Sequence, residues 1–153
     1  MNKEKLYIRK ITTPYSKVVT YKLMNEKDET LTELCAEKEH PFNLFFYLPN
    51  CNENDKVLYI TNFTTKKQYR NKGYGKYLLT KVINRFKGKY DMVHLNACPY
   101  HIKNDGTPIF EAPKNGLNEN KLIEFYKNIG FEEKRKMLMH RTDKYTVMIM
   151  NLK

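Results

Sequence analysis

The sequence between residues 57 and 97 places two closely spaced glycines between a strand-like segment and an amphipathic one, and then returns to a strand-like pattern. In the segment VLYITNF, residues 57–63, the apolar and polar side chains alternate well enough to predict a strand. Residues 76–86 carry apolar side chains at i, i+1, i+4, i+5 and i+8, which predicts a helix with one apolar face. The segment DMVHLNA, residues 91–97, alternates again and predicts a second strand.

The residues after this second strand continue the alternation of helices and strands. A long irregular insert with three prolines and two glycines is predicted over 99–116, and inserts of that length are often functional. Asn118 has the position of a helix N-cap, and Gly130 that of the residue that ends the helix. The segment YTVMIMNL, residues 145–152, is predicted as a closing strand. Without internal repeats or an obvious linker, the pattern predicts one α/β (α+β) domain over residues 1–153, built around a single sheet.

The first half of the sequence has weaker patterns. Lys5–Ile11 and Lys17–Met24 are rich in β-branched and aromatic residues, which predicts two strands joined by a turn, as in a hairpin. Asp28–Glu39 has apolar residues at i, i+3 and i+4, which predicts a short helix before Pro41. The segment FNLFFYLP, residues 42–49, is predicted as a buried strand.

The charge balance favours an anionic partner. Lys and Arg number 28 against 17 Asp and Glu, which gives a net charge of +11. Nucleic acid, an anionic membrane and a polyphosphate ligand all fit such a balance, and so does a lysine-rich surface that only keeps the chain soluble.

The cysteines and the lengths of the apolar segments indicate where in the cell the protein is expected. The three cysteines are an odd number without CxxC spacing, so we expect reduced thiols, neither a disulfide framework nor a zinc site. The first residues are charged and lack the apolar segment of a signal peptide, and no apolar run approaches the roughly 20 residues that span a bilayer. The expectation is a cytoplasmic protein that uses no membrane and no metal.

The two glycines identify a phosphate-binding pattern by elimination. A P-loop would need a glycine at Arg70 and Ser or Thr at Tyr77, and a dinucleotide fingerprint would need a third glycine at Leu78. The pattern that remains is R-x-x-G-x-G, with Gly73 and Gly75 at the start of the predicted helix. Main-chain amides at a helix start, together with the positive end of the helix dipole, form a ready anion site.

This segment resembles the acyl-CoA pyrophosphate loop of the GNAT superfamily of N-acetyltransferases, whose pattern is Q/R-x-x-G-x-G/A. A second segment, FYKNIGF at residues 125–131, resembles the Y-x-x-x-G-F that ends the next helix of the family. The resemblance covers residues 57–131 well and the first 56 residues poorly. It implies a GNAT-like fold, with a mixed, mostly antiparallel and twisted sheet of about six to seven strands, flanked by helices and splayed at the acyl-CoA site.

The resemblance also implies which residues bind acetyl-CoA as the co-substrate. Main-chain groups near Phe63 to Thr65 would hold the pantetheine and the thioester, and the glycine loop would hold the pyrophosphate. The expected cofactor-binding residues are Phe63, Thr64, Thr65, Arg70, Asn71, Lys72, Gly73, Tyr74, Gly75, Lys76 and Asn118. Many relatives carry an asparagine seven residues before the motif tyrosine, where this chain has Glu119, and a shift of one residue to Asn118 would restore that contact.

The implied reaction is direct transfer of an acetyl group to a primary amine within a ternary complex. Tyr126, the tyrosine of the second motif, is the expected acid for the leaving thiolate, because a phenol can donate a proton. His94 is the expected base, on the same strand face as Asn96, with His101 and Glu111 of the insert as further candidates. The resemblance leaves the acceptor amine open, and homodimers are common among relatives.

Two other functions fit parts of the sequence. A catalytically silent acyl-CoA-binding domain would keep the loop without transferring an acyl group. A basic nucleic-acid-binding module would use Tyr69, Tyr74 and Tyr77 to stack bases, but no RRM, KH or zinc-knuckle pattern is present, so nucleic acid is not a required partner.

Overall fold

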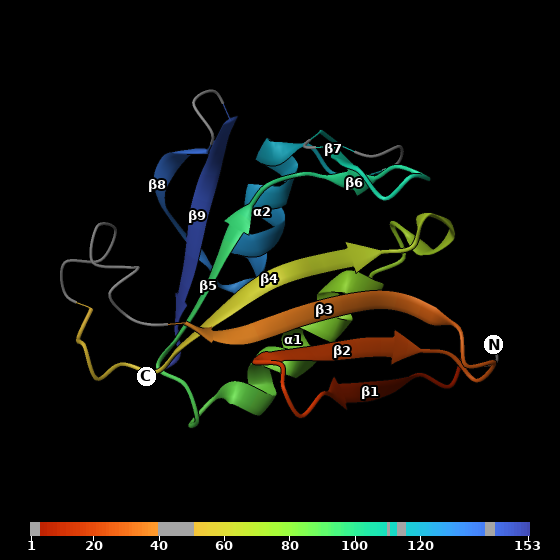
Figure 1. The fold of residues 1–153 in the computed structure, drawn as a ribbon, viewed down its shortest axis with the longest axis horizontal. Coiled ribbons are helices and arrows are strands. Elements are labelled where there is room, and N and C mark those ends of the chain that lie inside the picture. Colours follow the sequence, from red (N-terminus) through yellow and green to blue (C-terminus); the bar gives the residue numbers. More distant parts are fainter. Residues whose placement is uncertain (1–3, 40–50, 110, 113–115, 140–142) are drawn as a thin grey trace.

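A seven-stranded sheet forms the centre of the computed structural model, which describes residues 4–39, 51–109, 111–112, 116–139 and 143–153 (Figure 1). The strands lie in the order β1-β2-β3-β4-β5-β9-β8. They are β1 (Tyr7–Thr12), β2 (Val18–Met24), β3 (Thr30–Glu39), β4 (Val57–Thr65), β5 (Met92–Ala97), β8 (Glu132–Met139) and β9 (Asp143–Asn151). The helices are α1 (Tyr74–Phe86) and α2 (Glu119–Ile129), and β6 (His101–Ile102) pairs with β7 (Pro108–Ile109) in a separate ladder.

The sheet is mixed and mostly antiparallel. Only the β4–β5 pair is parallel, and the other five pairs of neighbours are antiparallel. The hairpin predicted near the start is confirmed as β1 and β2, with Tyr7 opposite Met24. The seven-stranded mixed sheet with flanking helices confirms the predicted fold class.

The helix predicted over 28–39 is wrong, because this segment forms β3. Leu34 and Ala36 are fully buried on one face while Glu33 and Glu37 are half-buried on the other, which is the period of a strand. The strand pairs with β2 on one side and with β4 on the other, so its main chain is satisfied by the sheet. The apolar spacing that predicted a helix was too short to separate the two periods.

Other predictions had mixed outcomes. Both helices are confirmed, and α2 begins as predicted, with Asn118 Oδ1 accepting from the Lys121 amide at 2.9 Å. The predicted irregular insert contains the short β6–β7 ladder, and β8 was not predicted at all. The strand predicted over 42–49 lies outside the described residues.

One buried cluster joins both helices to the sheet. The apolar side of α1 packs under β2, β3 and β4, and α2 lies beside β5 and β9 (Figure 1). Leu78 and Leu79 of α1 are fully buried, and each such side chain contributes roughly 1.5–3 kcal/mol to folding. The packing fixes the first turn of α1 against the end of β4. No helix in the described part of the chain is long and apolar enough to cross a membrane.

Candidate active site

The two parallel strands separate at the middle of the sheet. Pairing between β4 and β5 covers only the four residue pairs from Val57–Met92 to Ile60–Leu95. Beyond Ile60, β4 continues beside β3, while the chain after β5 turns away toward β6 (Figure 1). The register with β3 shifts at the same place, since Ile60 and Asn62 pair with consecutive β3 residues and Thr61 forms a bulge. This splay matches the opening that the sequence predicted.

Main-chain groups of β4 face the opening. The Thr64 carbonyl points toward β3, where it accepts from Thr32 Oγ1 at 2.8 Å, whereas the Thr65 carbonyl accepts from Arg70 Nε at 3.1 Å on the loop side. Successive residues of a strand direct their main-chain groups to opposite sides, so those of Phe63 and Thr65 share one direction. That direction is toward the space that β5 has left.

The glycine loop brings the start of α1 against this opening. Gly73 is the N-cap and has φ 84°, a left-handed conformation that glycine adopts without strain. A Cβ on Gly75 would lie 3.3 Å from the Phe63 ring and 3.4 Å from Thr65 Oγ1, so the first turn approaches β4 too closely for most side chains. The first amides of a helix have no partner within the helix, and here they lie beside the cavity. The loop therefore has the geometry of an anion site.

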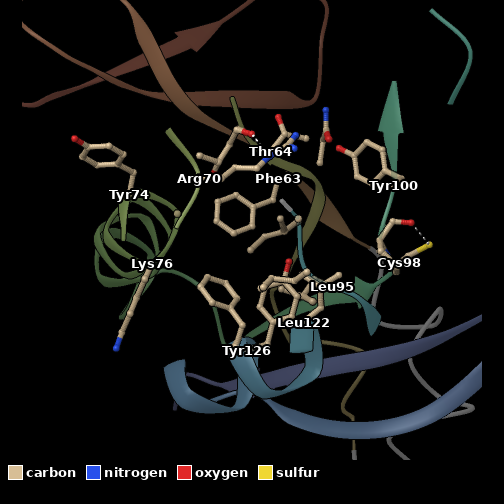
Figure 2. Close-up of a pocket in the computed structure, with 18 of the residues that line it drawn as sticks. Phe63, Thr64, Arg70, Tyr74, Lys76, Leu95, Cys98, Tyr100, Leu122 and Tyr126 are labelled. Carbon is tan, nitrogen blue, oxygen red and sulfur yellow. Dashed lines mark hydrogen bonds between the residues drawn. The ribbon is translucent and has the colours of Figure 1, made fainter. Parts of the chain in front are cut away.

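A cavity of about 370 Å³ extends from this loop into the splay (Figure 2). Its walls come from β4, the start of α1, the end of β5 and the α2 residues Leu122, Phe125 and Tyr126. Apolar walls beside a row of main-chain amides suit an extended ligand with a phosphate at one end.

The cavity collects most of the residues predicted to bind acetyl-CoA. Those that line it are Phe63, Thr64, Thr65, Arg70, Asn71, Gly73, Tyr74, Gly75 and Lys76. Lys72 is exposed, and its ammonium lies 5.8 Å from the centre of the Tyr69 ring. Asn118 is the N-cap of α2, and it does not belong to the cavity wall among the described residues. Glu119 accepts a hydrogen bond from Thr146 of β9 at 3.0 Å, which helps to anchor the start of α2.

Tyr126 lies at the base of the cavity. The residue is buried, and its ring packs edge-on against Phe125 and Phe131, with ring centres 5.2 and 5.7 Å away. Burial, with a smaller effect of Tyr100, raises the pKa of the Tyr126 phenol above its ordinary value. The hydroxyl therefore stays protonated and can act as a donor at neutral pH.

His94 does not line the cavity, and its side chain is on the same face of β5 as that of Asn96. Its Nδ1 is 2.6 Å from a Glu39 carboxylate oxygen, and its ring stacks on Tyr59 with centres 4.9 Å apart. Because a carboxylate only accepts hydrogen bonds, Nδ1 carries a proton, and in the neutral tautomer with that proton the lone pair is at Nε2. Nε2 is buried and has no hydrogen-bond partner among the described residues. Asn96, two residues further along, does line the cavity and donates to the Tyr59 hydroxyl at 3.0 Å.

The structure adds two residues that the sequence did not indicate. Glu39 lies in the segment predicted as a helix, so its contact with His94, 55 positions away, had no local signal. Tyr100 lies in the short link between β5 and β6 and lines the cavity. Of the remaining base candidates, Glu111 is exposed, and the side chain of His101 lies outside the described part of the chain, so both stay predictions.

The splayed strands, the glycine loop and the cavity between them have the arrangement of a site for an extended anionic ligand at a helix start. The Acetyltransferase (GNAT) family model matches residues 25–106, more than half of the chain. The chain belongs to this family of acetyltransferases, which confirms the resemblance found in the sequence. None of the curated protein sequences matches it significantly.

Solved structures of N-acetyltransferases share the fold. Arabidopsis thaliana NAA60 in complex with acetyl-CoA is 15% identical, with a TM-score of 0.58 over 90% of this chain and 77% of that one. A mutant of the spermidine N-acetyltransferase SpeG from Vibrio cholerae is 9% identical, with a TM-score of 0.59 over 91% and 67%. A ribosomal-protein-alanine N-acetyltransferase from Escherichia coli is 11% identical, with a TM-score of 0.55 over 94% and 81%. At these identities the likeness shows a common fold.

Proposed function

We propose that this protein transfers an acetyl group from acetyl-CoA to a primary amine by direct attack in a ternary complex. The observation that carries the proposal is the continuity of one cavity from the amides at the start of α1 to the main chain of β4 and on to Tyr126. The amides suit the pyrophosphate, the splayed strand suits the pantetheine and thioester, and a buried phenol suits the leaving sulfur. The complex of NAA60 with acetyl-CoA supports the choice of donor.

The amine must lose its charge before it can attack. A lysine-like amine has a pKa of about 10.4, so making it neutral at pH 7 costs roughly 4–5 kcal/mol. In the proposal, His94 takes the proton through a water at Nε2, and Glu39 holds the ring by its Nδ1–H. Asn96, on the same strand face and at the cavity wall, is placed to hold the amine or that water.

The bonds and protons of this step balance. The amine nitrogen bonds to the thioester carbon while the carbon–sulfur bond breaks. The first proton of the ammonium passes through His94 to solvent before the attack. The second amine proton passes to His94 as the amide forms, and the CoA sulfur takes the phenol proton of Tyr126. Solvent then carries a proton from the imidazolium to the phenolate, so both side chains return to their starting states.

Two loop tyrosines favour this function over nucleic-acid binding. The Tyr69 hydroxyl donates to Glu29 at 2.9 Å and the Tyr74 hydroxyl donates to Glu4 at 2.7 Å, with the two rings packed edge-on. Stacking bases on these rings would require the contacts that hold their hydroxyls and pack them together to break. These tyrosines therefore support the wall of the cofactor site.

The deciding experiment combines binding with turnover. We expect acetyl-CoA and CoA to raise the Tm of the protein, and acetyl-CoA to release free thiol with at least one amine from a panel of polyamines, peptide N-termini and lysine peptides. Saturable CoA binding without thiol release for any acceptor would instead identify a silent binder. Strongly salt-dependent retention on RNA without any effect of CoA would identify the nucleic-acid alternative.

The role of His94 predicts a particular pH dependence. We expect His94→Gln to lower kcat/KM about 10²-fold at pH 7, and the loss to shrink as the pH rises toward the pKa of the acceptor amine, because a neutral amine needs no base. The acetyl-CoA-dependent rise in Tm should persist. A loss of equal size at every pH would show that His94 only supports the sheet.

A further inference from the structure

Tyr100 lies where the chain leaves β5, and its side chain reaches into the splay from the side opposite the glycine loop (Figure 2). The ring is partly buried, but the hydroxyl oxygen is inaccessible to solvent and has no hydrogen-bond partner among the described residues. A buried polar group without a partner costs about 1–3 kcal/mol, so native structures hold few of them and each needs a specific explanation, such as a group that a ligand completes. Neither the acid role of Tyr126 nor the base role of His94 uses this hydroxyl.

The hydroxyl faces the main chain of β4. Burial raises the pKa of Tyr100 to about 12, against a smaller opposite effect of the main-chain amide of Phe63. The strand register gives the geometry: the main-chain N–H of Phe63 points away from β3 into the space that β5 leaves, and Tyr100 lines the same cavity. The hydroxyl remains protonated at neutral pH, which leaves its proton available as a second donor.

Two donors thus converge on one region of the splay, one from the main chain and one from a side chain. An oxygen placed there would accept from the Phe63 N–H and the Tyr100 O–H together. In the proposed reaction, the group that enters the splay is the thioester, and its carbonyl oxygen gains negative charge as the amine attacks.

We propose that the Tyr100 hydroxyl donates a hydrogen bond to the thioester carbonyl oxygen of the acyl donor, beside the main-chain amide of Phe63. This assignment rests on the proposed function, because it presupposes that acetyl-CoA enters the cavity. The proposed hydrogen bond from Tyr100 forms with acetyl-CoA and not with CoA, since CoA has a thiol in place of the thioester carbonyl.

The difference between the two ligands provides the test. Calorimetry should show that Tyr100→Phe weakens acetyl-CoA binding about three- to tenfold and leaves CoA binding within about twofold. We also expect kcat with the best acceptor to fall about 10- to 100-fold, because one of two donors to the developing oxyanion is lost. Tyr77→Phe is the matched control, since Tyr77 is exposed on α1 and lies outside the cavity wall.

Each remaining outcome has a defined meaning. If wild type binds neither ligand, the proposed function fails, and the role of Tyr100 fails with it. If wild type binds both and Tyr100→Phe leaves the preference and kcat unchanged, only the Tyr100 assignment is overturned. Tighter acetyl-CoA binding by the variant also overturns it, because the hydroxyl would then obstruct the carbonyl. Should the variant not fold, a crystal structure of the wild-type acetyl-CoA complex decides: the proposal requires about 3.2 Å or less between the Tyr100 hydroxyl and the carbonyl oxygen.

Discussion

Replacing Tyr126 by Phe is expected to lower kcat about 10²- to 10⁴-fold while the affinity for CoA stays within about twofold. The substitution removes one hydroxyl and keeps the ring, whose edge-on contacts with Phe125 and Phe131 hold the end of α2. The packing of the cavity should therefore survive, and only the proton for the leaving sulfur is lost. Single-turnover thiol release and CoA calorimetry measure the two effects separately.

The leaving group supplies a second readout for Tyr126. A donor thioester whose thiol has a lower pKa needs less help from an acid, so Tyr126→Phe should lose less activity with it than with acetyl-CoA. Tyr77→Phe again serves as the control for removing a tyrosine hydroxyl outside the cavity. An equal loss with both donors would mean that the Tyr126 hydroxyl positions the substrate and donates no proton.

The raised pKa of Tyr126 also predicts an alkaline effect on stability. Folded Tyr126 holds its proton to higher pH than an unfolded tyrosine, whose pKa is about 10. Its contribution is therefore complete below about pH 10 and is lost as the pH rises further, because the unfolded chain then releases the proton first. In Tyr126→Phe this part of the alkaline destabilisation should be absent from urea unfolding curves.

The parts of the fold that the sequence predicted correctly are those with a local signal. The helix α1 has five apolar residues at regular spacing, and α2 has a capping asparagine at one end and Gly130 at the other. In both helices, the apolar spacing and the residues that start or end the helix occur within about a dozen residues. No distant contact was needed to recognise them.

The errors arose where distant pairing decides the structure. The strand β8 carries a charged stretch that lacks strand-like alternation, and it forms because β9 supplies a partner edge. The turn before β3 depends on Asn25, whose buried side-chain oxygen accepts from the amides of Lys27 and Glu29. This turn reverses the chain, so that the following residues pair with β2 in the sheet. The weak helical spacing of that segment carries no sign of this pairing.

The two motifs predicted which segments meet at the cavity. Both motifs contribute to one cavity, because the loop after β4 and the helix α2 meet where β4 and β5 separate. Tyr100 and Glu39 belong to no motif, and their importance comes from partners on other strands. Unpartnered polar atoms in a closed space are visible only when the chain is folded, so no reading of spacing would have identified Tyr100.

Replacing Gly75 by Leu is expected to abolish the acetyl-CoA-dependent rise in Tm. Even a Cβ at this position would lie 3.3 Å from the Phe63 ring and 3.4 Å from Thr65 Oγ1, and a branched side chain cannot fit between the helix and β4. The first turn of α1 must then move away from the strand. That movement separates the helix amides from the β4 main chain, and a ligand that needs both loses most of its affinity.

A general loss of stability must be separated from this effect. Lys81→Gly is the matched control, because Lys81 is exposed in the middle of α1 and replacing a good helix former by glycine costs roughly 0.5–1 kcal/mol without entering the cavity. We expect the control to unfold at a lower temperature and still to gain Tm with acetyl-CoA. Gly75→Ala should fall between the two, since a single methyl group requires Phe63 to move by only a few tenths of an ångström. If Gly75→Leu keeps the full ligand-dependent rise, the phosphate end of the ligand does not lie between the start of α1 and β4, and the cavity must bind acetyl-CoA in another way or not at all.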